Sequence, residues 1–288
     1  MLDLFQHDFV RNAFLAGGVV AIVSGLVGYF VVLRGQAFAS EALSHVGFTG
    51  ATAAALLGIS SLEGMLFFTL LAALGMGLLG KRLRNRDVEV GMILTFMLGL
   101  GVLFLSILTQ NATTAVNILF GSILSVTQTD VLVTIGGGLA TIILLVCMFR
   151  PLLFASFDPE IAEARGVPSQ ALSVLFLLLL AISVSEAMKV VGVLLVFALL
   201  VVPAAAAEHL AHRPFSAIIL SISISLVSCW GGLVLAFVGH WPASFYIVSL
   251  TSIFYFVSLG LRAILFPHRY KEPAHPSREV FPEVPNTG

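Results

Sequence analysis

The sequence predicts an all-α, polytopic membrane protein, a bundle of about eight or nine transmembrane helices. Two observations predict this class. The 288 residues are 59% hydrophobic and only 10% charged, with a mean hydropathy of +1.07, whereas a soluble domain carries about 25% charged residues. Apolar runs of about 20 residues, the length needed to cross a bilayer, also recur along almost the whole chain.

Hydropathy places the individual spans along the chain. They are expected near residues 10–33, 37–58, 62–80, 89–109, 130–149, 168–188, 190–211, 215–239 and 243–266. A shorter segment, 113–126, cannot cross unaided, and we expect it to be re-entrant or tucked between helices. The chain therefore divides into a transmembrane domain, residues 1–266, and a proline-rich tail, residues 267–288, which is expected to be flexible.

The basic residues predict how the bundle lies in the membrane. All lysines and arginines except Arg11 and Lys189 fall in alternate connections or in the tail. Positively charged connections face the cytoplasm, so this side, with the C-terminus, is expected inside. The net charge of −1 gives no indication of a nucleic-acid partner.

One glycine-rich motif is rejected as a nucleotide site. Residues 75–82, GMGLLGKR, nearly match the phosphate-binding loop, but Arg82 stands where a Ser or Thr hydroxyl is needed for magnesium. These glycines also end a membrane helix instead of following a strand. No ATPase activity is therefore expected in this chain.

The connection 150–168 predicts a short amphipathic helix on the cytoplasmic side. Asp158 suits the N-cap, Pro159 the first helical position, and Glu160 places a negative charge in the first turn. Gly166 can end the helix, and Pro168 blocks its continuation. Such a helix could dock a soluble partner or lie on the lipid surface, and the sequence leaves both interpretations open.

Two features within spans are candidates for function. Pro203, followed by four alanines, predicts a kink in its helix. Glu41 is expected to be the only acid inside a span and away from its end, and His45 the only histidine so deep. A carboxylate in the bilayer costs roughly 2.5–3.5 kcal/mol on insertion scales, so it is a functional candidate.

Glu41 and His45 share one helical face because they are four residues apart. A carboxylate oxygen with an imidazole nitrogen suits Mn²⁺, Fe²⁺ or Zn²⁺. Two ligands do not close a structural site, which fits a transport path that binds and then releases. A structural hydrogen bond between Glu and His, or a proton relay, remain alternatives.

Four stretches carry a family resemblance by their order and spacing: VLRGQAFASEALSHVGFTG (32–50), NILFGSIL (117–124), FDPEIAEARGVP (157–168) and VVGVLLVFALLVVPAAAA (190–207). In these four stretches the chain resembles the integral-membrane permeases of metal-ion ABC importers, the zinc/manganese/iron group. The resemblance implies a homodimer in the bacterial cytoplasmic membrane, two cytoplasmic ATPase subunits and an extracytoplasmic metal-binding protein. It implies no enzymatic activity and no cofactor, since the metal ion is the cargo.

The resemblance also assigns roles to residues. It implies that residues 157–166 are the helix that couples to the ATPase, and the matching positions are Asp158, Pro159, Glu160, Ala162, Glu163, Arg165 and Gly166. In the family, an aspartate and a histidine four residues later line the metal path, and they match Glu41 and His45. Glu41 is one methylene longer than the usual aspartate.

The expected function is therefore the permease subunit of an ABC importer for zinc, manganese or iron. One alternative is an ABC permease for metal chelates or a vitamin, which would need a wider and less charged pathway. A second alternative is a stand-alone, proton-coupled secondary transporter with Glu41 as the proton carrier.

Overall fold

The computed structural model describes residues 8–79, 86–108, 119, 121, 123, 126–211, 213–239 and 241–265. Its helices are α1 (Asp8–Leu33), α2 (Ala37–Leu57), α3 (Ser61–Leu79), α4 (Arg86–Ile107), α6 (Gln128–Phe157), α7 (Pro159–Ala164), α8 (Ser169–Val191), α9 (Val193–Leu200), α10 (Val202–Leu210), α11 (Pro214–Val238) and α12 (Ala243–Leu265). The residues described form no strand, which confirms the all-α class. Most of the segment 113–126 and the whole tail 267–288 lie outside the described residues.

Eight helical stretches of the described chain are long and apolar enough to cross a membrane. They are α1, α3, α4, α6, α8, α9 together with α10, α11 and α12. With 21 residues, α2 is long enough to span, but it is not in this set, because Glu41, His45 and several Ser, Thr and Gly residues lower its hydropathy. The nine expected spans correspond to these eight and α2.

The connection after α6 is shorter than the sequence suggested. The span expected to end at residue 149 continues as helix to Phe157, through Arg150 and Pro151. Leu152 is fully buried, so packing of this last part of α6 outweighs the backbone hydrogen bond that Pro151 cannot make. The expectation that this helix ends at residue 149 is therefore wrong.

Two breaks interrupt the chain after α8. This helix continues to Val191, three residues past its predicted end, and stops at Gly192, whose φ of 83° is a conformation that favours glycine. A second break falls at Val201, and Pro203 lies in the first turn of the next helix, α10. This break lies beside Pro203, where the sequence predicts a kink.

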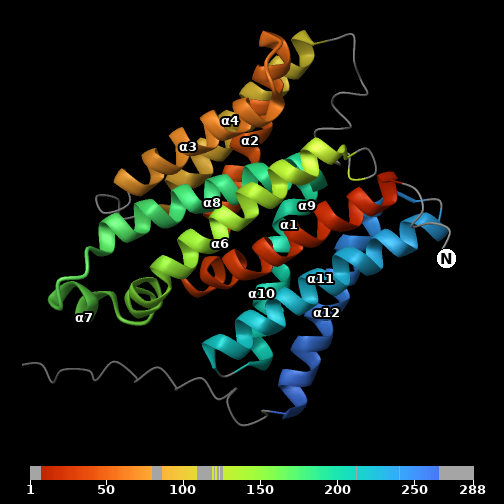
Figure 1. The fold of residues 1–288 in the computed structure, drawn as a ribbon. Coiled ribbons are helices and arrows are strands. Elements are labelled where there is room, and N and C mark those ends of the chain that lie inside the picture. The colour runs from red at the N-terminus through yellow and green to blue at the C-terminus, as the bar shows by residue number, and fades with distance from the viewer. Residues whose placement is uncertain are drawn as a thin grey trace, which may run out of the picture.

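The helices form two groups on either side of α1, α6 and α8 (Figure 1). On one side α2 packs against both α3 and α4, and α3 packs against α8. On the other side α10, α11 and α12 pack against one another, and α1 contacts α6, α8 and α11. The backbones of α1 and α11 nearly touch at Gly25, where a Cβ atom would lie 2.7 Å from Cα of Ile222.

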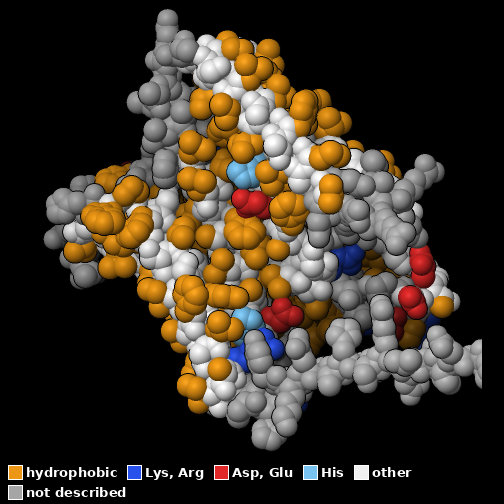
Figure 2. Space-filling model, turned by 180° about the vertical axis from the view of Figure 1, so that it is seen from behind, with side chains coloured by type: hydrophobic (Ala, Val, Ile, Leu, Met, Phe, Trp, Pro, Cys, Tyr) orange, Lys and Arg blue, Asp and Glu red, His pale blue; other side chains and the backbone are white. Residues whose placement is uncertain are grey.

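Apolar side chains cover much of the molecular surface (Figure 2). Phe96 of α4, Leu132 of α6 and Phe215 of α11 are all more than three-fifths exposed in the isolated chain. A water-soluble protein does not expose apolar surface on this scale, whereas lipid is its natural solvent. The chain is a multi-pass membrane protein.

The charged residues mark two different ends of the bundle. At the end that carries α7, the Arg34 guanidinium donates hydrogen bonds to Ser156 and Ser173. At the start of α1, the Arg11 Nη2 lies 3.0 Å from Oδ1 of Asp8. Lys189, in the last turn of α8, lies 2.7 Å from Asp130 in the first turn of α6. The two basic residues that broke the charge pattern are thus each paired with an acid, far from α7 along their helices.

Candidate functional site

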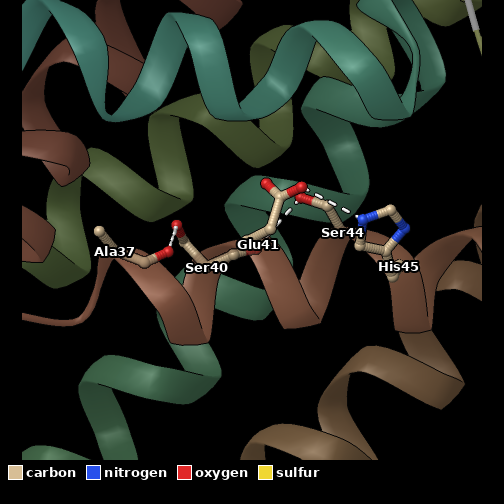
Figure 3. Close-up of polar contacts among 5 residues, drawn as sticks. All are labelled: Ala37, Ser40, Glu41, Ser44 and His45. Atoms are coloured by element: carbon tan, nitrogen blue, oxygen red, sulfur yellow. Dashed lines mark hydrogen bonds and ion pairs between the residues drawn. The ribbon is translucent and has the colours of Figure 1, made fainter. Parts of the chain in front are cut away.

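The candidate metal ligands lie together near the beginning of α2. Figure 3 shows Glu41 and His45 projecting from the same side of the helix. The Nε2 atom of His45 lies 3.1 Å from Oε1 of Glu41. The hydroxyls of Ser40 and Ser44 turn back to carbonyls of α2 itself, at 2.7 and 3.1 Å. The acid and the imidazole are therefore the groups of this turn that face outward together.

The pair is neither fully buried nor freely exposed. The side chain of Glu41 is 34% exposed and that of His45 is 19% exposed. The second carboxylate oxygen of Glu41, Oε2, is buried and has no hydrogen-bond partner among the described residues. A buried carboxylate oxygen without a donor is unusual, and it is suited to bind a cation.

The helix beneath the pair is held against its neighbours. Thr49, one turn beyond His45, hydrogen-bonds the carbonyl of Met97 on α4. At Gly50, the backbone of α2 lies directly against the backbone of Gly64 on α3. These contacts hold the part of α2 that follows the pair against α3 and α4.

Glu41 is not the only acid inside a long helix. It is the fifth residue of α2, whereas Glu186 lies five residues before the end of α8. The Glu186 carboxylate rests against Gly137 of α6 and lines a small pocket with Ser24 and Thr134. Sequence analysis placed Glu186 at the end of a span because the predicted span ended at residue 188, whereas α8 continues to Val191. The expectation that Glu41 alone occupies such a position is therefore wrong.

The structure places the second described histidine elsewhere. His209, at the end of α10, has its Nδ1 3.3 Å from the Ser258 hydroxyl of α12, and its ring packs against Tyr255. Figure 2 shows histidine side chains (pale blue) next to acidic side chains (red) on a largely apolar face. Within the described residues, no three side chains of His, Cys, Asp or Glu come together as a closed metal site.

The short helix α7 begins as the sequence predicts. Asp158 is its N-cap, and a carboxylate oxygen accepts a hydrogen bond of 3.0 Å from the Ile161 backbone N–H. Pro159 occupies the first helical position and Glu160 the first turn. These three features are local and act without tertiary contacts, so a helix of only 6 residues can form here.

The other end of α7 is fixed equally well. Gly166 adopts a φ of 81°, and the Val167 N–H donates to the carbonyl of Ala162 at 3.0 Å. Ala162 is fully buried, whereas Glu163 and Arg165 are exposed. The predicted capped helix is confirmed. Ala162 packs on the bundle, whereas Glu163, Arg165 and also the apolar Ile161, which is 48% exposed, lie outward.

Comparison with known families decides which group of proteins this architecture belongs to. The model of the ABC 3 transport family matches residues 6–262, which include every described helix except the last residues of α12. The chain belongs to the ABC 3 transport family. The predicted resemblance to metal-ion ABC permeases is thereby confirmed.

Several relatives of this ABC 3 protein are described as manganese transporters. The manganese transport system membrane protein MntC of Halalkalibacterium halodurans is 32% identical over 232 residues, which cover 80% of each chain. The manganese import system permease protein ScaB of Streptococcus parasanguinis is 32% identical over 256 residues, which cover 88% of this chain and 91% of the relative.

Solved structures show the same fold for the ABC 3 protein. One is described as PsaBC from Streptococcus pneumoniae in complex with Fab. It matches with a TM-score of 0.81 and 32% identity, covering 89% of this chain and 92% of the other. An inward-facing, putative metal-chelate type ABC transporter matches with a TM-score of 0.63 at 18% identity, and that likeness concerns the fold alone.

Proposed function

We propose that this chain is the permease subunit of an ABC importer that carries a divalent transition-metal ion, with manganese as the first candidate. The observation that carries the proposal is the Glu41–His45 pair, with Oε1 and Nε2 3.1 Å apart and Oε2 buried without a donor from any described residue. Two relatives described as manganese transporters, both 32% identical, support manganese over zinc and iron.

The chemistry of the pair suits a transient binding station. An arriving divalent ion replaces the hydrogen bond between Glu41 and His45 and takes one oxygen and one nitrogen ligand. The remaining positions belong to water or to a second copy of the chain. Two protein ligands hold the ion weakly enough to release it again. The pair therefore suits a transient site on a transport pathway, in contrast to a structural site that keeps its metal.

The proposed assembly is a homodimer that brings two Glu41–His45 pairs to a central pathway. ATPase subunits dock at α7, through the segment from Asp158 to Gly166, and an extracytoplasmic binding protein delivers the ion at the opposite end. ATP hydrolysis belongs to the ATPase subunits, and this chain performs no covalent chemistry. The assembly lies in the bacterial cytoplasmic membrane with α7 and the C-terminus inside, as the charge pattern predicts.

Uptake of radioactive manganese by a strain lacking this chain, complemented with plasmid-borne variants, tests the proposal. We expect His45→Ala to lower the initial rate at least about tenfold, equivalent to about 1.4 kcal/mol of lost stabilisation. Ser44→Ala is the matched control, because the Ser44 hydroxyl bonds the carbonyl of Ser40 on its own helix and should be dispensable. Normal uptake by a well-expressed His45→Ala variant would exclude the pair as a ligand.

A second measurement separates the ABC importer from a secondary transporter. Vesicles that contain the permease with its ATPase subunits should take up manganese only with ATP inside. Inhibition of manganese uptake by added zinc or iron in the same vesicles ranks the three ions by preference. Equal uptake by the permease alone, driven by a proton gradient, would favour the secondary transporter instead.

A further inference from the structure

Arg34 joins three helices at the end of the bundle that carries α7. It follows α1 directly, and its Nη1 donates to the Ser156 hydroxyl of α6 at 3.3 Å. Its Nη2 donates to the Ser173 hydroxyl of α8 at 2.7 Å, and its guanidinium carbon lies 5.6 Å from the centre of the Phe176 ring. The planar guanidinium can hold several partners at once, which a lysine ammonium does less well.

The two serines flank α7 on either side in the chain. Ser156 lies in the last turn of α6, three residues before Pro159, and Ser173 lies in the second turn of α8. The helix α7 is itself tied to this region, because Ala162 is fully buried and Arg165 lies over the Phe154 ring of α6. A force on α7 therefore moves the two hydroxyls that Arg34 binds.

On its other side, Arg34 leads directly into α2. The connection consists of Gly35, with a φ of 62°, and Gln36, which is 3% exposed. The Gly35 N–H donates to Val32 and the Gln36 N–H to Val31, at 3.0 and 2.8 Å, a pair of bonds that fixes the direction in which the chain leaves α1. A connection of two residues, with both backbone N–H groups bonded to α1, transmits displacement instead of absorbing it.

The Glu41–His45 pair begins just beyond this connection. The Ser40 N–H donates to the carbonyl of Gln36 at 3.0 Å, which starts the first turn of α2, and Glu41 is the next residue. The path from α7 to the pair thus runs through Ser156 and Ser173, then Arg34, then one rigid corner. No other residue of the described chain is bonded to both flanks of α7 and adjoins α2.

We propose that Arg34 is the positioning residue that transmits movement of α7 to the Glu41–His45 pair. This inference rests on the proposed function, which sets the direction of transmission: movement starts where the ATPase docks at α7 and ends at the cation path on α2. Its bonds to Ser156 and Ser173 join a guanidinium to neutral hydroxyls, which can exchange partners as α6 and α8 shift. Arg34 itself does not touch the cation.

The decisive test measures transport and ATP hydrolysis together in vesicles that contain the complete importer. We expect Arg34→Met to lower the number of manganese ions moved per ATP at least tenfold, with the ATPase rate within twofold of the wild type. Arg34→Lys and Ser173→Ala should lower the ratio about threefold to fivefold, because each loses part of the contact. Arg150→Met is the matched control, because Arg150 is an exposed arginine of α6. The number of manganese ions that this variant moves per ATP should equal that of the wild type.

Hydrogen exchange gives a readout that does not depend on the cargo. ATP binding to the assembled complex should change exchange in residues 37–45 of the wild type, and in Arg34→Met the change should stop at residues 150–172. The proposal is overturned if Arg34→Met keeps the wild-type response at residues 37–45. It is also overturned if transport and ATPase rate fall in equal proportion. Wild-type vesicles that respond at residues 37–45 but move no manganese would contradict the proposed cargo and leave the role of Arg34 standing.

Discussion

The Ser225 hydroxyl lies 3.4 Å from the carbonyl oxygen of Leu199. This carbonyl is the one that would accept the helical hydrogen bond from residue 203, and Pro203 has no N–H to donate. Ser225 belongs to α11 and is fully buried, so a neighbouring helix supplies the donor that the proline removes. The kink between α9 and α10 is thus stabilised from outside its own helix.

Removing this hydroxyl should destabilise the bundle measurably. We expect Ser225→Ala to lower the free energy of unfolding by about 0.5–1.5 kcal/mol, the range of side-chain hydrogen bonds between membrane helices. Thermal unfolding of the purified protein in detergent measures the change. Ser223→Ala is the matched control, because the Ser223 hydroxyl is exposed and bonds the Ile219 carbonyl of its own helix.

Restoring the missing donor should make Ser225 less important. In a Pro203→Ala background the backbone N–H of residue 203 can bond the Leu199 carbonyl again. We therefore expect Ser225→Ala to lower the free energy of unfolding by less than half as much as it does in the native chain. An equal cost in both backgrounds would show that the hydroxyl acts through some other contact.

A glycine in α1 should tolerate no side chain beside the same kink. A Cβ atom on Gly28 would collide with the carbonyl oxygen of Leu200, so Gly28→Ala must push α1 away from α9 and α10. We expect a loss of about 1–3 kcal/mol, typical of overpacking, seen as a lower melting temperature. Gly99→Ala should be neutral or slightly stabilising, because no described residue outside its own stretch of α4 has an atom within 4 Å of the Cβ position. Similar melting temperatures for both variants would refute the close approach.

The negative charge of the Glu41 side chain should matter more for manganese uptake than its length. Glu41→Gln keeps the shape of the side chain but removes the negative charge, and we expect manganese uptake to fall at least about tenfold. Glu41→Asp should keep uptake within about threefold, because a carboxylate remains beside His45. Initial rates at several manganese concentrations measure both. Uptake by Glu41→Gln at the wild-type rate would mean that the carboxylate is not a ligand.

The N-cap of α7 offers a separate test of ATPase docking. Asp158→Ala removes the side-chain acceptor for the Ile161 N–H, which costs about 1 kcal/mol of helix stability. We expect faster hydrogen exchange across residues 160–164 and weaker co-purification of the ATPase subunits. Asp158→Asn retains an acceptor and should behave like the wild type. Undiminished co-purification of Asp158→Ala would argue that α7 is not the docking element.

The features that sequence predicted well are those controlled by short-range chemistry. Hydropathy located the spans because each must cover the same thickness of lipid. The caps of α7 followed from Asp158, Pro159 and Gly166, whose preferences act within one turn. The spacing of Glu41 and His45 likewise predicted their contact, because residues four apart meet on any α-helix.

The features that sequence missed depend on tertiary packing. The helix α6 continues past Pro151 because Leu152 is buried against the rest of the bundle, and no local pattern records that burial. The contacts of Arg34 were equally hidden, since Ser156 and Ser173 are 17 residues apart and carry no motif. Arg34 itself contributed only its charge to the predicted orientation.

The two ion pairs remote from α7 bear on how a cation approaches the protein. A lone ammonium in water repels a divalent ion 4 Å away by about 2 kcal/mol. Asp8 compensates Arg11 within the same turn, and Asp130 compensates Lys189 from the adjacent helix. Paired charges act as short dipoles whose field fades within a few ångströms. If the proposed function is correct, a divalent ion arriving at this end meets only a weak repulsion from these two basic side chains.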